Sequence, residues 1–150
     1  MHTHSVLQKF FTVSLPAVHP HRRDAVVAAV DSVSQGAAVS ITAMGRGLAA
    51  ATRIKHRVKR MDRLVGNRRL NAERDRFYQA MIQRLLAACA QPIIVIDWSD
   101  FSDDRQQQLL RAALPVGGRG LTLYEELHPY AKLANRRVQH RFLDRLKRLL

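Results

Sequence analysis

The pattern of apolar residues changes at Pro92, and this change narrows the folds open to the chain. Before Pro92, apolar side chains recur at the three- and four-residue spacing of an α-helix. After it, residues 93–96 form an unbroken apolar run that ends at Asp97, and a short run of this kind is typical of a strand buried on both faces. The sequence therefore predicts a mainly helical region over residues 1–90, which folds on its own, and a sheet-containing domain over residues 91–150.

Length and composition exclude several classes of protein. The 150 residues are 47% hydrophobic and 25% charged, which suits a chain with a buried core and not a disordered one. No apolar stretch approaches the roughly 18 to 20 residues of a membrane span, and the N-terminus lacks the features of a signal peptide. Cys89 is the only cysteine, so internal disulfides and cysteine-cluster zinc sites are excluded. We therefore expect a cytoplasmic protein with no membrane partner.

Apolar periodicity and end signals predict five helices in the N-terminal region. The first two end at Pro16 and Gly36, which are common helix stops. Ser40 or Thr42 can cap a short third helix, and Thr52 can cap the fourth, because their side-chain oxygens accept hydrogen bonds from backbone N–H groups. The five helices cover residues 6–15, 26–33, about 42–51, 54–65 and 71–89.

Positive charge is concentrated in one segment of this region. The chain carries a formal net charge of +13, and residues 53–76 hold ten basic side chains against three acidic ones. Because binding of Lys and Arg to phosphates releases condensed counterions, this excess predicts a polyanionic partner. A second basic stretch covers residues 132–148, and residues 97–104 between the two contain four aspartates and no basic residue.

A short helix, a turn and a longer basic helix are the arrangement of a helix-turn-helix. In that motif the second helix lies in the major groove of duplex DNA. The apolar positions of residues 54–65 recur on one helix face and leave the basic positions mostly on the other. Residue types alone do not specify which bases are read. The DNA-binding candidates are Arg53, Lys55, His56, Arg57, Lys59, Arg60, Arg63, Asn67, Arg68 and Arg69.

The second domain is expected to contain three strands and a final helix. Gly117 and Gly118 separate two apolar segments at the spacing of a hairpin turn, and residues 121–124 alternate as in a strand. Residues 102–114 also have good helix propensity, but the hairpin spacing favours a strand there. Apolar positions between residues 133 and 149 predict an amphipathic helix.

Asp97 is the candidate catalytic and metal-ligating residue. The end of a central strand is where a sheet presents groups to an active site, and carboxylates are ligands for hard cations such as Mg²⁺. The local pattern favours equally a plain turn in which Asp97 and Ser99 cap the residues that follow. The residues themselves leave both interpretations open.

Three segments carry a resemblance to a known family. They read KHRVKRMDRLVGN at residues 55–67, IVIDWSD at 94–100 and GLTLYE at 120–125. Together they resemble the N-terminal part of bacterial insertion-sequence DDE transposases, most nearly the insertion sequence 4 family. The resemblance implies a helical DNA-end-binding region with a helix-turn-helix, followed by an incomplete α/β domain of ribonuclease H-like fold. It also implies that Asp97 is the first carboxylate of the DDE triad.

The resemblance implies a catalytic site that this chain does not complete. A second aspartate and a later glutamate complete the family's triad, and neither is matched here: Asp100, Asp103, Asp104, Glu125 and Glu126 do not fall at those positions. Two divalent ions activate the attacking oxygen and stabilise the leaving one, and a single carboxylate cannot hold both. The full-length family would use Mg²⁺ or Mn²⁺. We expect this chain to bind neither tightly and to be inactive alone.

The function expected from these observations is that of a truncated cut-and-paste DDE transposase. Its partner would be double-stranded DNA, namely the transposon terminal inverted repeat, on the nucleoid in the bacterial cytoplasm. Self-association is a further expectation, because in the sheet that the resemblance implies the strand at residues 93–96 would lack its parallel neighbour on one side. Two alternatives use the same basic helix: a helix-turn-helix transcriptional regulator, which would bind a palindromic operator, and a basic RNA-binding protein, which would prefer RNA.

Overall fold

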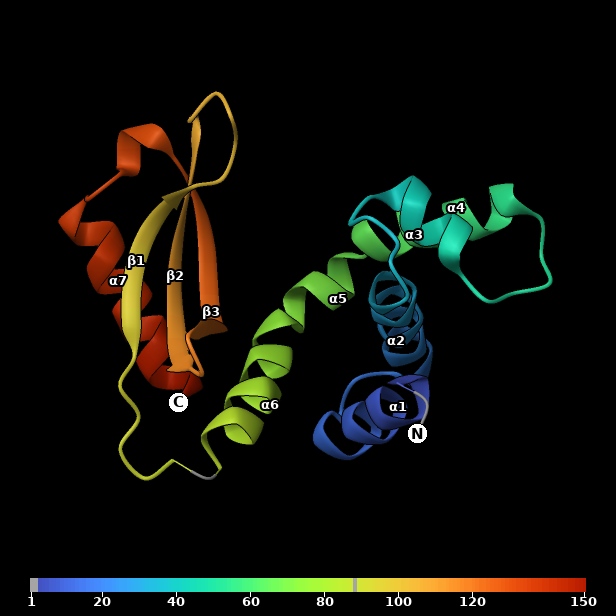
Figure 1. Cartoon of the computed structure of the whole chain (residues 1–150), viewed down its shortest axis with the longest axis horizontal. Helices are drawn as coiled ribbons and strands as arrows, with labels where there is room; N and C mark the ends of the chain where they lie inside the picture. Colours follow the sequence, from blue (N-terminus) through green and yellow to red (C-terminus); the bar gives the residue numbers. More distant parts are fainter. Residues whose placement is uncertain (1–2, 88) are drawn as a thin grey trace. The chain divides into compact units, whose positions relative to one another are not determined.

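A computed structural model describes residues 3–87 and 89–150, which form six helices, then a three-stranded antiparallel sheet, and then a last long helix (Figure 1). The strands are β1 (Val95–Asp100), β2 (Gln107–Val116) and β3 (Arg119–Pro129). The chain is therefore a mixed α/β protein with a helical N-terminal part. The helices are α1 (Thr3–Ser14), α2 (Pro20–Ser34), α3 (Ile41–Gly47), α4 (Ile54–Val65), α5 (Arg68–Ala72), α6 (Arg74–Leu86) and α7 (Arg136–Leu149), with a 3₁₀ helix at Tyr130–Lys132.

The chain divides into two compact units, Met1–Arg76 and Phe77–Leu150. The division falls within α6 and not at residue 90, where the sequence placed it. The reason is packing, because Ile82 of α6 is buried in the apolar cluster of the sheet, with Tyr78 and Leu85 packed against the same cluster. Most of α6 therefore belongs to the second unit.

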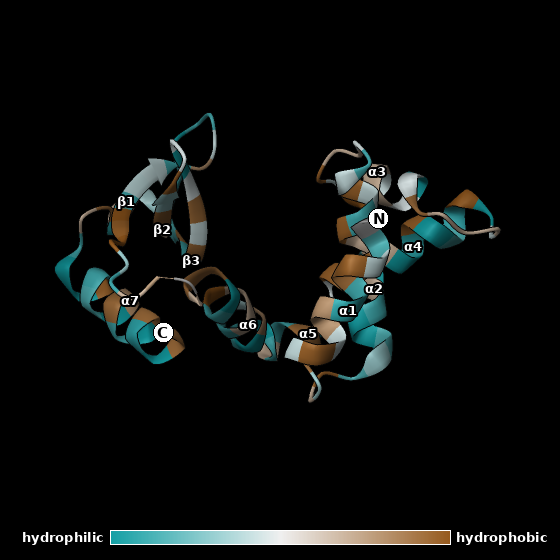
Figure 2. Ribbon diagram, turned by 60° about the horizontal axis from the view of Figure 1, so that its bottom comes forward, coloured by the Kyte–Doolittle hydropathy of each residue, from teal (hydrophilic) through white to brown (hydrophobic). Residues whose placement is uncertain are grey.

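Helices α2, α3 and α4 pack around a small apolar core in the first unit. Met61 of α4 is fully buried and clusters with Ala29 of α2 and with Leu48, which follows α3. Where α3 passes α4, a Cβ atom added to Gly45 would lie only 2.5 Å from the Cα atom of Val58, so a larger residue does not fit. In Figure 2 much of the α4 ribbon has the colour of hydrophilic residues. The packing therefore fixes which face of α4 is exposed.

Helix ends in the first unit confirm some of the predicted caps and correct others. The Ser40 side chain accepts a hydrogen bond from the N–H of Ala43 at the start of α3, as predicted. Thr52 does not cap α4, because Arg53 takes the N-cap position, without a side-chain hydrogen bond. The single helix predicted over residues 71–89 overlaps the end of α5 and the whole of α6, which are separated at Glu73, and α6 ends at Leu86. Residue 88 of the predicted helix lies outside the described residues.

An ion pair between Arg22 and Glu73 ties the end of α5 to α2. The Arg22 Nε and Nη2 atoms donate to the two carboxylate oxygens of Glu73 at 2.8 and 2.6 Å. This two-point geometry matches a planar guanidinium to a carboxylate. The hydrogen bond from Arg22 holds the pKa of the Glu73 carboxyl below its usual value, and the same contact raises the pKa of Arg22.

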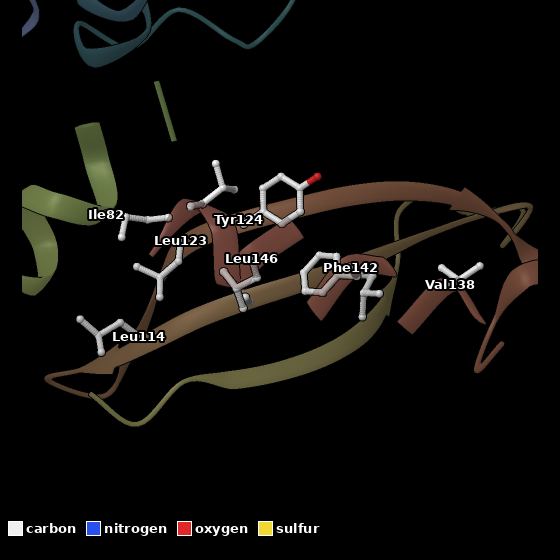
Figure 3. Close-up of a cluster of buried hydrophobic side chains, with 10 residues drawn as sticks. Ile82, Leu114, Leu123, Tyr124, Val138, Phe142 and Leu146 are labelled. Carbon is white, nitrogen blue, oxygen red and sulfur yellow. The ribbon is translucent and has the colours of Figure 1, made fainter. Parts of the chain in front are cut away.

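In the second unit, α6 and α7 supply the side chains that cover the core of the sheet. The strands follow the order β1-β2-β3, with Trp98 opposite Leu110 and Ala112 opposite Tyr124. Val138 and Phe142 of α7 join this core, and Figure 3 shows them together with Tyr124 and Leu123. The buried members of the cluster are Ile82, Leu110, Ala112, Leu114, Leu123, Tyr124, Val138, Phe142, Leu146 and Leu149.

The predicted hairpin and C-terminal helix are confirmed. Gly117 and Gly118 have φ angles of +55° and +75°, which suit the turn that joins β2 to β3. The register of the two strands shifts by one residue between Ala112 and Ala113, which is a β-bulge in the pair. The alternative of a helix over residues 102–114 is therefore wrong, because residues 107–114 belong to strand β2.

Strand β1 differs from the prediction in both position and burial. It covers Val95–Asp100, so Asp97 lies inside the strand and not at its end. In the described part of the chain, β1 pairs only with β2, which makes it an edge strand. Val95 is 50% exposed and Ile93, before the strand, is 75% exposed. The apolar run is therefore not buried on both faces: Ile94 packs against the apolar cluster of the second unit, whereas its neighbours Ile93 and Val95 are left exposed.

Candidate nucleic-acid interface

Five side chains form a continuous basic surface on the exposed side of α4, which we call the α4 basic face. Lys55, Lys59 and Arg63 follow one another at intervals of four residues, and His56 and Arg60 form a second row beside them. All five are exposed, whereas Met61 is buried and Val58 and Leu64 are half-buried on the opposite side. Residues four apart lie one above the other on a helix, so the rows run along its axis.

One acidic residue lies beside this face. Asp62 forms an ion pair with Lys59 in the next turn, and both side chains are substantially exposed. An exposed pair of this kind contributes little to stability. It does not neutralise the charges of Lys55, Arg60 and Arg63. The α4 basic face therefore keeps a clear excess of positive charge.

Arg57 does not belong to the α4 basic face, although its residue type suggested that it would. Its side chain is half-buried, and its Nη1 atom donates a hydrogen bond to the carbonyl oxygen of Leu48 at 2.6 Å. The Nε atom is buried and has no hydrogen-bond partner among the described residues. Arg57 thus connects α4 to the chain just after α3, and it serves the fold.

The remaining candidates from the sequence divide in the same way. The side-chain oxygen of Asn67 accepts a hydrogen bond from the N–H of Leu70 and caps α5, so this amide has a structural role. Arg53 before α4, and Arg68 and Arg69 at the start of α5, are exposed. The structure therefore leaves eight of the ten candidates on the surface and places Arg57 and Asn67 in local hydrogen bonds.

Sequence reasoning missed a polar hollow beside α3. It is an open depression of about 690 Å³, and its lining includes Ser40, Thr42 and Arg46. These three residues are exposed and offer two hydroxyls and one guanidinium to an anion. The lone arginine within α3 was the signal available in the sequence.

Asp97 lies on the exposed edge strand and uses its carboxylate locally. Its Oδ1 atom accepts a hydrogen bond from the backbone N–H of Trp98 at 2.8 Å. Together with Gln139 and His140 of α7, Asp97 lines a cavity of about 320 Å³ beside Ile96. The cavity is therefore lined by one carboxylate, one imidazole and one amide, with apolar residues around them.

Several other carboxylates of the second unit are held by partners of their own. Asp100 accepts from Gln108 at 2.7 Å, and Glu126 accepts from the Tyr124 hydroxyl. A hydrogen bond from the Ser102 hydroxyl lowers the pKa of Asp104. Among the residues that the structure describes, no three His, Cys, Asp or Glu side chains come together as a metal site. The donor set around Asp97 therefore does not fit a two-ion centre.

Comparisons with known proteins found no protein-family model, no curated protein and no solved structure that matches the chain. None of the helices described in the structure combines the length and the apolar character that crossing a membrane requires.

Proposed function

We propose that the chain binds duplex DNA through the α4 basic face, as the DNA-end-binding part of a DDE transposase whose catalytic centre it does not complete. The observation that carries the proposal is the segregation of α4: Lys55, His56, Lys59, Arg60 and Arg63 line one exposed side, and the opposite side is packed on α2 and α3. An exposed helix of this width and charge fits the major groove of B-form DNA.

The packing of α4 supports a role as the recognition helix of a helix-turn-helix. Its apolar side is held by the core around Met61 and by the close approach of Gly45 to Val58. In this reading α3 is the first helix and crosses the DNA backbone, where Arg46 and the hydroxyl of Thr42 would contact phosphates. The chain between α3 and α4, residues 48–53, is longer than the turn of the simplest such motifs.

The choice of duplex DNA over RNA rests on what the α4 basic face lacks. It contains no Phe, Tyr or Trp, and sequence-specific RNA readers commonly stack unpaired bases on such side chains. The assignment to a transposase rather than a transcriptional regulator rests on the resemblance of residues 55–67, 94–100 and 120–125, and on the order β1-β2-β3 followed by α7, which is compatible with part of a ribonuclease H-like sheet.

The proposal is tested with two matched variants of the full chain. The α4 variant carries Lys55→Gln, Arg60→Gln and Arg63→Gln, which keep helix propensity while removing three charges. The control variant carries Arg84→Gln, Arg119→Gln and Lys132→Gln, three exposed positions outside the α4 basic face. Both are titrated into a labelled duplex of about two helical turns, roughly 20 base pairs, with fluorescence anisotropy as the readout.

The α4 variant should bind the duplex more weakly by about 1 to 3 kcal/mol and should lose about three units of salt slope. The control variant should bind as the parent does. Equal binding by the parent and the α4 variant would contradict the proposal. If the parent binds an RNA stem-loop more tightly than the DNA duplex, the RNA-binding alternative is favoured. If two chains bind one palindromic duplex, a transcriptional regulator is favoured.

A further inference from the structure

A second basic surface lies on α7, which belongs to the other compact unit. Exposed Arg136, Arg137, Arg141, Lys147 and Arg148 form it, and we call it the α7 basic face. Arg137, Arg141 and Arg148 are four and seven residues apart, so they fall on one stripe along the helix. None of the five was among the DNA-binding candidates taken from the sequence.

Charge is separated within the second unit. Helix α7 holds six basic residues and one acidic residue, Asp144, whereas residues 77–135 hold five basic and six acidic residues. The sixth basic residue of the helix, Arg145, is half-buried and lies with its guanidinium 5.7 Å from the centre of the Tyr124 ring. The positive charge of this unit is therefore gathered on the exposed side of α7, and such a surface attracts polyanions.

The burial of the apolar side of α7 decides between a membrane and a nucleic acid as the polyanion. A basic amphipathic helix binds a lipid surface by inserting its apolar side. In α7 that side consists of Val138, Phe142, Leu146 and Leu149, which are at most 4% exposed because they pack on the sheet. Only the charged side is available, which suits a phosphate backbone.

The make-up of the exposed side favours a duplex over a single strand. Proteins that bind single strands stack bases on aromatic side chains, and the one aromatic residue of α7, Phe142, is fully buried. Fourteen helical residues extend about 21 Å, which corresponds to about six base pairs along the axis of B-form DNA. The stripe of Arg137, Arg141 and Arg148 can therefore follow one phosphate backbone.

We propose that the α7 basic face is a second site for duplex DNA, contacted through its phosphates without base readout, and that one chain bridges two duplexes by using the α4 and α7 basic faces together. The two faces share no residue and lie on different compact units. The bridging rests on the proposed function of α4, but binding at α7 does not.

The experiment uses the full chain and three variants that each lose three charges. The α7 variant carries Arg137→Gln, Arg141→Gln and Arg148→Gln, and it is compared with the α4 variant and the control variant. In the first arm, each protein is titrated into one labelled duplex over a range of salt concentrations. In the second arm, a bead-bound duplex captures a free labelled duplex, at protein concentrations where sedimentation finds only monomer.

In the first arm the α7 variant should take up one duplex per chain where the parent takes up two, and in the second arm it should capture less free duplex than the parent, by about tenfold or more. The control variant should match the parent in both arms. An α7 variant that titrates like the parent would overturn the second site. Weakened titration by both the α4 and α7 variants, with no capture by the parent, would overturn bridging, because both faces would then contact the same duplex.

The failure of the proposed function has a different signature. If the α4 variant titrates like the parent and the α7 variant does not, the α7 site stands and the α4 assignment is wrong. Phosphatidylserine vesicles serve as the competitor in the first arm. If they bind the parent more tightly than the duplex does, and the α7 variant loses that binding, then the α7 basic face belongs to a membrane surface and the inference is overturned.

Discussion

Arg57 donates a hydrogen bond to the carbonyl oxygen of Leu48 at 2.6 Å, across the gap between α4 and the end of α3. A side chain in the middle of this strongly basic helix is therefore committed to the fold. Its neighbour Arg60 is exposed and makes no such contact among the described residues. The two arginines should behave differently when they are replaced.

Replacement of Arg57 should lower stability, and replacement of Arg60 should not. Arg57→Ala removes the hydrogen-bond donor and leaves the Leu48 carbonyl oxygen without its partner. This should lower the free energy of unfolding by about 1 to 3 kcal/mol. Arg60→Ala, on the exposed face, should change it by less than about 0.5 kcal/mol. Urea unfolding followed by circular dichroism measures both. Equal stability of the two variants would contradict the role given to Arg57.

Binding of the parent chain to a single duplex should depend strongly on salt. Five or six phosphate contacts correspond to a slope of log affinity against log salt of roughly −4 to −6. The α4 basic face with Arg53, Arg68 and Arg69 beside it supplies enough exposed cations for that number. Anisotropy titrations at several salt concentrations give the slope, and an affinity nearly independent of salt would rule out binding by charge.

The chain should neither nick nor join DNA ends in the presence of Mg²⁺ or Mn²⁺. Asp97 is the one carboxylate in its cavity, and its Oδ1 atom is hydrogen-bonded to the N–H of Trp98. A gel assay on duplexes that carry the terminal repeat is the measurement. Metal-dependent cleavage that is lost in both Asp97→Ala and Asp97→Asn would mean that a neighbouring carboxylate completes a site, since the Asn variant can keep the bond to Trp98.

The first unit should lose stability in acid, because the Arg22–Glu73 pair stabilises it only while Glu73 is ionised. Because Arg22 holds the folded-state pKa of Glu73 below the unfolded value of 4.5, the pair contributes fully above that pH. The contribution is lost as the pH falls through the lower, folded-state pKa. Glu73→Gln should therefore be less stable than the parent near neutral pH and should show a flatter decline below about pH 4.5. Thermal melts across this range check it, and parallel declines of the two proteins would refute the assignment.

The free edge of β1 should promote self-association. Unpaired backbone groups on an edge strand recruit further strands, and a lysine on the edge opposes this. Val95→Lys should shift the protein toward monomer at high concentration. Val116→Lys is the matched control, because Val116 is equally exposed, at 50%, but lies beside the hairpin turn. Sedimentation velocity distinguishes them, and the idea fails if both variants associate to the same extent.

The parts of the fold that depend on local sequence could be predicted. Apolar spacing located α4 and α7 closely, and the two glycines at 117 and 118 marked the hairpin, because these signals lie within a few residues of one another. The burial of residues 93–96 could not be predicted in this way, since it depends on which distant parts of the chain cover each face of the strand.

The same distinction applies to the candidate site. The charge and spacing of Lys55, Lys59 and Arg63 are visible in the sequence and lie on one face in the structure. The contact of Arg57 with Leu48 depends on how α3 meets α4, and the packing of Ile82 in the second unit depends on the sheet. Because Ile82 of α6 packs in the core of the second unit, a fragment that ends at residue 90 would separate α6 from the core that it covers.

The close approach at Gly45 has a consequence for binding. Because α3 and α4 meet there backbone to backbone, no side chain at that point can change rotamer and tilt one helix against the other. The direction in which α4 presents Lys55 and Arg63 is thus set before any ligand arrives. A preorganised helix loses little conformational entropy on docking. Gly45→Ala would force α3 and α4 apart and so weaken the binding of a partner by disordering α4, with no change in charge.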